Sequence, residues 1–366
     1  VLRKLQPNFE ALIQSHQGIN GVLVTALSKN EHYDFESRYF WPWSGTNEDP
    51  VTGSTHTFLA KYWSERLGKT KMFSFQCSER SGFMEVELID EQKIGGLIFF
   101  QGGPVRQAQM TNRFQKRSKV PLFIGIDAEW GLGMRLDSVT KFPWNMTLGA
   151  IQDLKLIEEV GKQMALQSKQ LGVHFNFAPV LDINTNPKNP IIGNRSFGED
   201  KERVTERALA LMIGLQNNGV FATGKHFPGH GATSTDSHYT LPVINFTQEQ
   251  IRNVELYPYK KLIDKGLASV MVAHLEVPAF ETRKGYPSSI SNIIVTDILK
   301  DELNFKGLIF TDALNMKGAS NFKSPGDIDL AAFQAGNDIL LFPENVPIAV
   351  QKIKEAYEQN IITEDR

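Results

Sequence analysis

The sequence predicts an α/β protein built on a (β/α) barrel, preceded by a smaller α+β segment. Three observations lead to this prediction. From about residue 94, short apolar runs alternate with amphipathic helical stretches, which is the order of a parallel sheet covered by helices. Polar residues stand at the ends of these runs, where the loops of a barrel line one mouth. Residues 1–90 instead read as mixed α+β, with two segments that alternate polar and apolar side chains, as antiparallel strands do.

The bulk composition limits the classes of function. The chain has 366 residues, of which 41% are hydrophobic, enough for one large barrel with an extra piece or for two domains. A net charge of −2 gives no electrostatic reason to expect nucleic acid as a partner. The single cysteine, Cys77, excludes an internal disulfide and a cysteine-based metal cluster. No apolar run approaches the length of a membrane span, so we expect a soluble bacterial-type protein, cytoplasmic or exported.

The first ninety residues predict a mixed sheet with one helix. Branched aliphatic residues after a glycine indicate a strand at 21–27, and an aromatic stretch indicates another at 37–43. The loop EDPVTGSTH (48–56) leads into a segment whose apolar residues recur at i, i+3 and i+4, so it predicts a helix that ends near Gly68. Two alternating segments predict further antiparallel strands, at residues 71–78 and 83–90.

The remainder of the chain predicts the barrel. Continuous apolar runs suit strands buried on both faces, and amphipathic segments such as LKLIEEVGKQMALQSKQLG suit the covering helices. A closed barrel of this type needs eight strands. We find seven, so we expect the first strand and helix to be missing and the barrel to be open or irregularly closed. The predicted strands are GGLIFF (95–100), PLFIGIDAE (121–129), FNFAPVLDI (175–183), VFATGKHF (220–227), SVMVAH (269–274), GLIFTDA (307–313) and DILLF (338–342).

Polar side chains end several of the predicted strands. An unpaired polar group is costly inside a buried strand, whereas the carboxyl ends of barrel strands meet at one mouth. One shared polar pocket therefore explains the pattern better than separate structural roles. The strand-end residues are Asp127 and Glu129, Asp182 and Asn184, Lys225 and His226, His274, and Asp312.

The stretch KHFPGHGATSTDSHYTLP (225–242) contains three histidines. On a helix, His226 and His230 would share a face, which would suggest zinc. Pro228 and the glycines beside it exclude a regular helix there, and a zinc site needs three or four ligands in a firm framework. A purely structural loop and a catalytic loop remain as the other two interpretations.

The catalytic interpretation has candidate residues for glycoside hydrolysis, which needs a carboxylate nucleophile and an acid/base group. Asp312 ends a buried strand and is the candidate nucleophile. Asp236 stands two residues before His238, and an aspartate beside a histidine orients the imidazole and stabilises its protonated form. The D-x-H pattern alone is common, so this assignment depends on the rest of the pocket.

The barrel segment resembles a known family over residues 94–366. The motifs that carry the resemblance are GIDAEWGLGMR (125–135), PVLDIN (179–184), IIGNRSFGED (191–200), KHFPGHGATSTDSH (225–238), SVMVAH (269–274) and IFTDALNMKG (309–318). They are similar to the N-terminal catalytic barrel of family 3 glycoside hydrolases, in the branch of the bacterial β-N-acetylhexosaminidases.

This resemblance implies a retaining, two-step mechanism that needs no metal or organic cofactor. Asp312 matches the nucleophile, and His238 with Asp236 matches the acid/base of this branch, carried on a mobile loop. The implied substrates are carbohydrates with terminal β-linked N-acetylglucosamine, on muropeptide or chitin fragments. The positions that match sugar-binding residues are Asp127, Arg135, Arg195, Lys225 and His226, with His274 lining the same pocket.

Residues 1–92 resemble the second half of the phenazine-biosynthesis isomerase family, which has the diaminopimelate-epimerase fold. In the motif EDPVTGSTH, Asp49 matches an active-site aspartate, and Gly53 and Ser54 lie in the loop beside it. The acid/base residues of that family belong to its first half, which has no counterpart here, so we expect no isomerase activity. The expected domains are thus 1–92 and 93–366. A catalytically impaired fusion, or residual isomerase-type activity through Asp49, are the alternatives to a working hydrolase.

Overall fold

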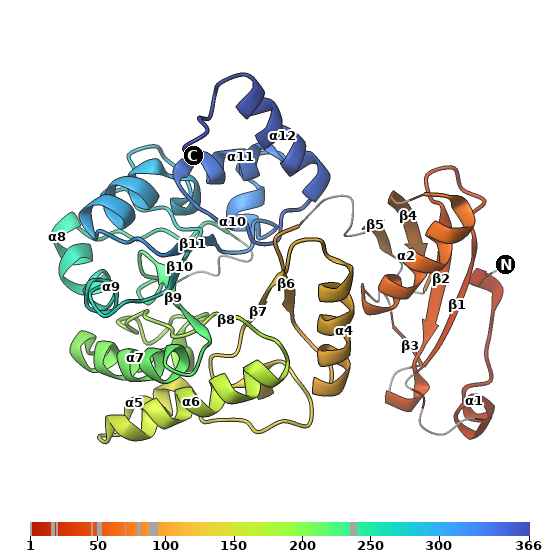
Figure 1. Cartoon of the computed structure of the whole chain (residues 1–366), viewed down its shortest axis with the longest axis horizontal. Coiled ribbons are helices and arrows are strands. Elements are labelled where there is room, and N and C mark those ends of the chain that lie inside the picture. The colour runs from red at the N-terminus through yellow and green to blue at the C-terminus, as the bar shows by residue number, and fades with distance from the viewer. Residues whose placement is uncertain are drawn as a thin grey trace. The chain divides into compact units, whose positions relative to one another are not determined.

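A computed structural model covers the chain (Figure 1) and describes all of it except residues 1, 16–18, 20, 45–46, 50–52, 70, 79–81, 88–93 and 235–239. For a few further residues only the backbone is described. Contacts divide the chain into two compact units, Val1–Lys93 and Ile94–Arg366. None of the helices in the described part combines the length and the apolar character needed to cross a membrane.

The first unit is a five-stranded, mostly antiparallel sheet with one long helix. The strand order is β1-β2-β4-β5, with β3 also paired to β2, and only the β2–β4 pair is parallel. One buried cluster joins the helix to the sheet, where the rings of Phe35 and Trp63 stack with centroids 5.7 Å apart. The elements are α1 (Phe9–Ser15), β1 (Val22–Leu27), β2 (Phe35–Phe40), β3 (Glu48–Asp49), α2 (Gly53–Leu67), β4 (Lys71–Gln76) and β5 (Gly82–Glu87).

The predicted strand at 37–43 is wrong at both ends. The strand begins earlier, at Phe35, and ends at Phe40, and Pro42–Ser44 forms a single 3-10 turn. The reason is local, because Pro42 has no N–H to donate and its fixed φ ends the ladder. The aromatic composition that predicted the strand continues past the point where backbone pairing stops.

The second unit is a curled parallel sheet of six strands in the order β11-β10-β9-β8-β7-β6 (Figure 1). All five neighbouring pairs are parallel, as expected for a βα repeat in which each strand is buried by helices. The strands are β6 (Gly96–Phe99), β7 (Phe123–Ile126), β8 (Phe175–Asn176), β9 (Phe221–Phe227), β10 (Ser269–Val272) and β11 (Leu308–Thr311).

Helices follow the strands and cover the outer face of the sheet (Figure 1). α6 and α7 both begin at an aspartate whose side chain accepts a hydrogen bond from the first turn, Asp153 and Asp200. The covering elements are α4 (Pro104–Arg117), α5 (Asn145–Gly149), α6 (Leu154–Gln170), α7 (Lys201–Gln216), α8 (Gln248–Gln250), the π-helix η5 (Ile251–Glu255), α9 (Tyr257–Ile263), the π-helix η7 (Ile293–Glu302), α10 (Lys317–Ser320), α11 (Asp327–Ala335) and α12 (Val346–Glu358).

The seventh predicted strand, DILLF (338–342), is not a regular strand. It lies beside β11 through one parallel bridge between Phe310 and Ile339. Backbone bonds join the two segments, because the Ile339 N–H donates to the Ile309 carbonyl and the Thr311 N–H donates to the Ile339 carbonyl, both at 3.0 Å. Side chains add two more bonds: the Asp338 carboxylate accepts from the Ile309 N–H at 2.8 Å, and the Thr311 hydroxyl accepts from the Leu341 N–H at 2.9 Å. The regular pairing is thus limited to one bridge.

The two ends of the sheet, β6 and residues 338–342, meet through side chains. The rings of Phe100 and Phe342 make an edge-to-face contact with centroids 5.2 Å apart. Within the described residues, no backbone ladder joins the two ends. The barrel is thus irregularly closed, in agreement with a chain that supplies seven apolar runs.

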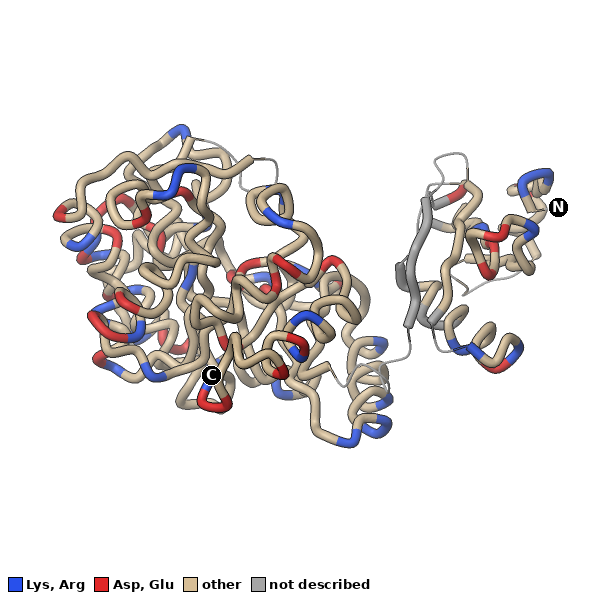
Figure 2. The backbone as a smooth tube through the Cα atoms, turned by 90° about the horizontal axis from the view of Figure 1, so that it is seen from above, with Lys and Arg blue, Asp and Glu red and all other residues tan. Residues whose placement is uncertain are grey.

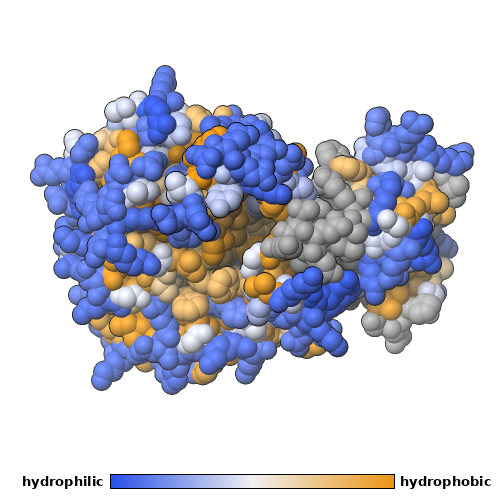
Figure 3. Space-filling view, turned by 45° about the horizontal axis from the view of Figure 1, so that its top comes forward, coloured by the Kyte–Doolittle hydropathy of each residue, from blue (hydrophilic) through white to orange (hydrophobic). Residues whose placement is uncertain are grey.

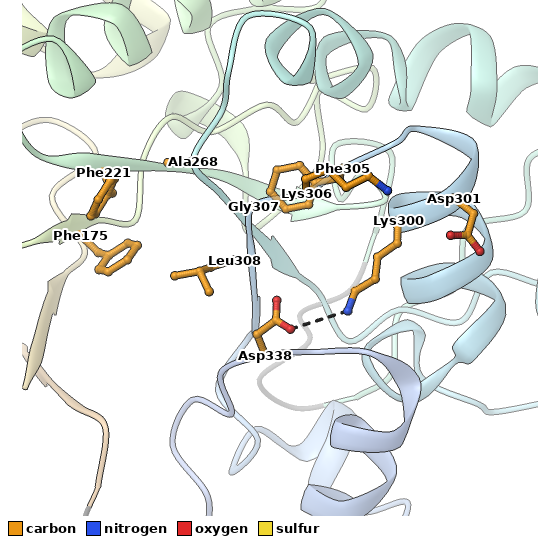
Figure 4. A pocket seen from close by; sticks show the side chains of 10 residues that line it. All are labelled: Phe175, Phe221, Ala268, Lys300, Asp301, Phe305, Lys306, Gly307, Leu308 and Asp338. Atoms are coloured by element: carbon orange, nitrogen blue, oxygen red, sulfur yellow. Dashed lines mark ion pairs between the residues drawn. The ribbon is translucent and has the colours of Figure 1, made fainter. Parts of the chain in front are cut away.

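An aromatic cluster fills the barrel. Phe175, Phe177, Met271 and Phe310 are buried together, and the rings of Phe175 and Phe310 meet with centroids 5.2 Å apart. A cavity of about 580 Å³ lies at the amino ends of the strands, where Phe221, Phe305 and Leu308 are among the residues that line it (Figure 4). The polar strand ends described below lie at the opposite ends of the same strands, so this cavity is separate from them.

The surface of the second unit carries mixed charge. Figure 2 shows acidic and basic residues interspersed along its helices and loops, in line with the net charge of −2. Figure 3 shows a face that is hydrophilic at its margins and hollowed over hydrophobic residues.

Helices α6 and α7 pack unusually closely, through glycine. A Cβ placed on Gly214 would lie 2.1 Å from the carbonyl oxygen of Glu158 and 2.9 Å from the Cα of Gly161. Real Cβ atoms do not approach a backbone so closely. The two glycines therefore set the distance between the helices.

We expect Gly214→Ala to lower the free energy of unfolding by about 1–3 kcal/mol, because the added methyl group forces the helices apart. Gly95→Ala is the matched control, since a Cβ there meets no atom within 4 Å. Urea unfolding of both variants checks the prediction. Equal stabilities for the two variants would contradict it.

Candidate active site

Lys225 is the centre of a charged cluster at the carboxyl ends of the strands. It lies in β9 and its side chain is only 2% exposed. Its Nζ donates to Asp127 Oδ1 at 2.7 Å and contacts Glu129 Oε1 at 2.8 Å. Both carboxylates follow β7, whereas Lys225 lies in β9. The cluster therefore joins the two strands that flank β8. A buried ammonium group between two carboxylates is fully compensated.

Two arginines complete this cluster. Arg135 Nη2 donates to Asp127 Oδ2 at 2.9 Å. Arg195, at the end of a 3-10 turn (Gly193–Arg195), donates to Glu129 through Nε at 3.0 Å and Nη2 at 2.7 Å. This two-nitrogen contact fixes the guanidinium plane. Asp127, Arg135 and Arg195 remain partly exposed, so they are the members of the cluster that face the mouth.

The cluster continues to a histidine pair held by Asp182. The Nδ1 of His226 lies 2.6 Å from Asp182 Oδ2, and its Nε2 lies 3.1 Å from Arg195 Nη2. This pairing makes Nδ1 the donor and Nε2 the acceptor. The backbone N–H of His230 also donates to Asp182, at 2.6 Å. One buried carboxylate therefore fixes both ends of the segment between the two histidines.

His230 lies within the loop and bonds to the loop itself. Its Nδ1 is 2.7 Å from the Thr233 hydroxyl, and it is only 1% exposed. Burial and the nearby His226 lower the pKa of His230 to about 4. The amide of Asn189 donates to the carbonyl oxygens of His230 and Gly231 at 2.8 and 3.0 Å. These contacts give His230 a role in shaping the loop.

Asp312 directly follows β11. Its backbone N–H donates to the Val272 carbonyl at 2.8 Å, and its Oδ1 accepts from the Ala313 N–H at 2.8 Å. Burial would raise the pKa of Asp312, but His226 and His274, the Ala313 N–H and Lys225 together lower it below its usual value. The side chain is thus an ionised carboxylate with one oxygen already fixed.

The pocket predicted from the strand ends also includes His274. It is fully buried, its Nδ1 lies 2.7 Å from the Ser289 hydroxyl, and its Nε2 lies 3.0 Å from the Ala313 carbonyl. Both ring nitrogens therefore face protein atoms. This geometry supports the segment after Asp312, and the place of His274 beside the sugar stays a prediction.

Burial and charge determine the ionisation of the central groups. Burial would raise the pKa of Glu129, but Arg195 and Lys225 hold it well below its usual range. Burial would lower the pKa of Lys225, but Asp127 and Glu129 raise it. The pKa of Arg195 is raised mainly by Glu129, against the effect of burial. All three groups are therefore charged in the folded protein.

Several predicted residues lie outside this description. Asp236 and His238 belong to residues 235–239, which are not described. Asp49 is in β3, and Gly53 and Ser54 begin α2, but their side chains are also outside the described part. In the described part of the chain, no three His, Cys, Asp or Glu side chains are grouped so as to hold a metal ion.

Two residues of the cluster, Glu129 and Asp182, were expected in the shared polar pocket from their strand-end positions, but no catalytic or sugar-binding role was predicted for them. Both are fully buried, and both connect other site residues to each other. The sequence signal was their position directly after an apolar run. Asn189 had no such signal, because it lies in a loop whose course only the structure defines.

A curled parallel sheet whose strand ends meet in a cluster of carboxylates and cations is typical of barrel glycosidases. The family model described as "Glycosyl hydrolase family 3 N terminal domain" matches residues 64–366, and the chain belongs to this family. A second model, described as "Phenazine biosynthesis-like protein", matches residues 1–96. Both resemblances found in the sequence are thereby confirmed.

The chain is similar to curated and solved relatives over its second unit. It is 37% identical to beta-hexosaminidase A of Pseudoalteromonas piscicida over 284 residues, which are 70% of this chain and 47% of that protein. A family 3 β-N-acetylglucosaminidase from Paenibacillus sp. is 37% identical with a TM-score of 0.72, and the match covers 76% of this chain and 55% of that one. NagZ from Neisseria gonorrhoeae, solved in complex with N-trifluoroacetyl-D-glucosamine, is 31% identical with a TM-score of 0.63, and the match covers 74% and 78%. The chain thus spans about half the length of the first two.

Proposed function

We propose that the protein is a retaining glycoside hydrolase that releases terminal β-linked N-acetylglucosamine. The main support is the position of Asp312, an ionised carboxylate at the end of β11. Its pKa is influenced by His226 and Lys225, so it lies close to the charged cluster. The names of the relatives, beta-hexosaminidase and β-N-acetylglucosaminidase, support the sugar.

In the proposed first step, Asp312 attacks the anomeric carbon of the sugar. The Ala313 N–H occupies Oδ1, which leaves Oδ2 to form the bond. The bond between the anomeric carbon and the leaving oxygen breaks, and His238 gives its proton to that oxygen. In the second step, His238 takes a proton from water while the water oxygen replaces Asp312 at the anomeric carbon. Two displacements restore the original configuration.

The charged cluster is proposed to hold the sugar. Asp127 accepts hydrogen bonds from hydroxyl groups, and Arg135 and Arg195 donate to hydroxyl or acetamide oxygens. Both arginines are about a quarter exposed, 26% and 21%, so parts of both side chains are accessible to a ligand. Lys225 is only 2% exposed. Its proposed contribution to sugar binding is mainly to hold the Asp127 carboxylate in place.

A chromogenic β-N-acetylglucosaminide tests the proposal, because hydrolysis releases a coloured phenolate. Proton NMR of the first product then gives the stereochemistry. We expect the β-anomer to form first and to mutarotate afterwards. No turnover by a folded sample, or the α-anomer as first product, contradicts the proposal. Chitin fragments and muropeptides as substrates distinguish the two proposed aglycones.

The proposed acid/base role of His238 predicts a leaving-group effect. In His238→Ala, the loss of kcat/KM should be about 100-fold or more for a chitin disaccharide, whose leaving alcohol needs a proton. For a nitrophenyl substrate the first step should be affected much less, because nitrophenolate leaves without one. Steady-state kinetics on both substrates measures the difference.

His32→Ala is the matched control for this experiment, because His32 is exposed in the first unit and should leave both substrates unaffected. Equal losses on the two substrates in His238→Ala would contradict an acid/base role for His238.

We propose residues 1–92 as a separate appendage without isomerase activity. All the described residues of the charged cluster, as well as Asp312, lie in the unit Ile94–Arg366. Glycosidase activity therefore depends on that unit alone in this proposal.

A further inference from the structure

Glu255 is a buried carboxyl group that the proposed reaction does not use. It is the last residue of the π-helix η5, and its side chain is 2% exposed. Neither carboxyl oxygen has a hydrogen-bond partner among the described residues. The hydroxyl group of Tyr259, one turn later on α9, is in the same situation and fully buried. Two buried polar side chains without hydrogen-bond partners, only four residues apart, are unusual.

Glu255 lies directly beneath the turn that begins the histidine-rich loop. A Cβ placed on Gly229 would come within 2.4 Å of Glu255 Oε2 and 2.8 Å of the Glu255 Cβ. Gly229 has a φ of +132°, which favours glycine, and its N–H donates to the His226 carbonyl at 2.8 Å. The backbone of the turn therefore rests on the Glu255 side chain.

Tyr259 supports the same segment from the side. Its ring packs edge-on against the ring of Phe227, with centroids 5.0 Å apart. Phe227 is fully buried and lies between His226 and the turn. Glu255 and Tyr259 together thus form the floor under residues 227–229.

Asp182, which also holds the turn, already carries a negative charge. Its carboxylate accepts from the backbone N–H groups of His226 and His230 and from the His226 ring. Burial first, and then the charge of Asp182, raise the pKa of Glu255 to about 8. At neutral pH the Glu255 carboxyl is therefore protonated.

In the part of the chain that the structure describes, Glu255 has no cationic partner. The titratable groups around it are Asp182 after β8, His226 and His230 from β9 and its loop, and Tyr259 on α9. Lys201 on α7 reaches the same helix, but its Nζ donates to the Asn253 carbonyl at 2.9 Å. Among the described residues, no ion pair includes Glu255. An ionised Glu255 would be a buried and unpaired charge, which is costly.

We propose that Glu255 is a positioning residue that functions as a neutral carboxylic acid, supporting the Gly229 turn so that His226 and His230 keep their places, and that its ionisation at alkaline pH displaces this turn. The activity part of this inference rests on the proposed glycosidase function, whereas the stability part does not.

Glu255→Gln tests the inference, because it keeps the shape and removes the ionisation. In the wild type, folding raises the pKa of Glu255 from 4.5 to about 8. The stability that the protonated form provides is complete below the lower value and is lost as the pH rises through the higher one. The difference in melting temperature, Glu255→Gln minus wild type, should therefore grow as the pH rises from 4.5 to about 8. Above that pH the difference should stay constant.

Glu249→Gln is the matched control, since Glu249 is exposed on α8 of the same helical stretch. Its melting temperature should follow that of wild type at every pH. Glu255→Met provides a second neutral side chain of similar size and should show the same pH dependence as Glu255→Gln. If the Gln variant does not fold, the Met variant takes its place. Parallel pH profiles for wild type and both Glu255 variants would overturn the inference.

Kinetics separates positioning from plain stability. On a nitrophenyl substrate, whose first step does not need the His238 proton, we expect Glu255→Gln to keep kcat/KM within about twofold at acidic pH and to move its alkaline limb to higher pH. If the melting curves change as expected but the alkaline limb stays in place, Glu255 has only a structural role and the positioning role is wrong. If no form of the protein hydrolyses the substrate while the melting curves change as expected, the proposed function fails and the ionisation of Glu255 stands.

Discussion

Replacing Asp312 by asparagine is expected to reduce turnover of a chromogenic β-N-acetylglucosaminide by at least about a thousandfold, because an amide lacks the negative charge and the nucleophilicity that the covalent step needs. Asparagine has the same shape, so the hydrogen bond from the Ala313 N–H is kept. The loss should appear in kcat with little change in substrate binding, since the carboxylate acts mainly in the transition state. Steady-state kinetics and a binding assay with a non-hydrolysed ligand measure the two effects.

The control for this experiment is Asp264→Asn, which makes the same chemical change at an exposed position at the end of α9. It should retain full activity. Melting curves of both variants show whether the fold is intact. Activity of a pure, folded Asp312→Asn sample within tenfold of wild type would rule out Asp312 as the nucleophile.

Replacing Glu129 by glutamine should have the largest effect on stability, about 3–5 kcal/mol in the free energy of unfolding. Glu129 is fully buried and bonded to both Arg195 and Lys225. Its removal leaves the buried Lys225 with Asp127 as its remaining counter-charge, and it takes the carboxylate partner from Arg195, which is 21% exposed. Urea unfolding at neutral pH measures the loss.

A matched exposed pair makes this prediction specific. Glu302 bonds to Arg252 at 2.8 Å, with side chains 39% and 37% exposed. Glu302→Gln removes the same kind of ion pair but should cost only about 0–1 kcal/mol. Similar losses in the two variants would show that burial of Glu129 has no special importance.

The lowered pKa of Glu129 predicts that the free energy of unfolding depends on pH. The pKa of Glu129 is 4.5 when unperturbed and is lowered in the folded protein. Its contribution to stability is therefore complete above 4.5 and decreases as the pH falls below that value. The difference in unfolding free energy between wild type and Glu129→Gln should shrink in acid.

Strand-end residues could be predicted from the sequence because the topology is regular. Asp127, Lys225 and Asp312 each follow or end a short apolar run, and parallel strands bring such ends to one mouth. The ion pairs and hydrogen bonds between these residues could not be predicted from the positions of the strand ends. Lys225 meets Asp127 across 98 positions of the chain, and local periodicity contains no information on a contact at that distance.

Elsewhere, the same reasoning was limited by interactions that depend on tertiary structure. DILLF (338–342) is as apolar as the true strands, yet its regular pairing with β11 is limited to one bridge, and side-chain bonds from Asp338 and Thr311 accompany the few backbone bonds. Glu255 lies in a helical stretch rich in charged residues, and a glutamate in such a stretch is expected to be exposed to solvent. Only the packing of η5 against the turn at Gly229 shows that its carboxyl group is buried.

The cluster at the mouth has one more consequence, for the kind of inhibitor the protein should prefer. Together with Asp312, it combines four carboxylates with three cations, which is one more negative than positive charge before the histidines are counted. The carboxylates are Asp127, Glu129, Asp182 and Asp312, and the cations are Arg135, Arg195 and Lys225. A neutral sugar gains little from this excess, whereas the partly cationic ring of a glycosidase transition state is stabilised by it. Ring-nitrogen analogues that carry a proton should therefore bind more tightly than their neutral, oxygen-containing counterparts, and acidic sugars should be disfavoured.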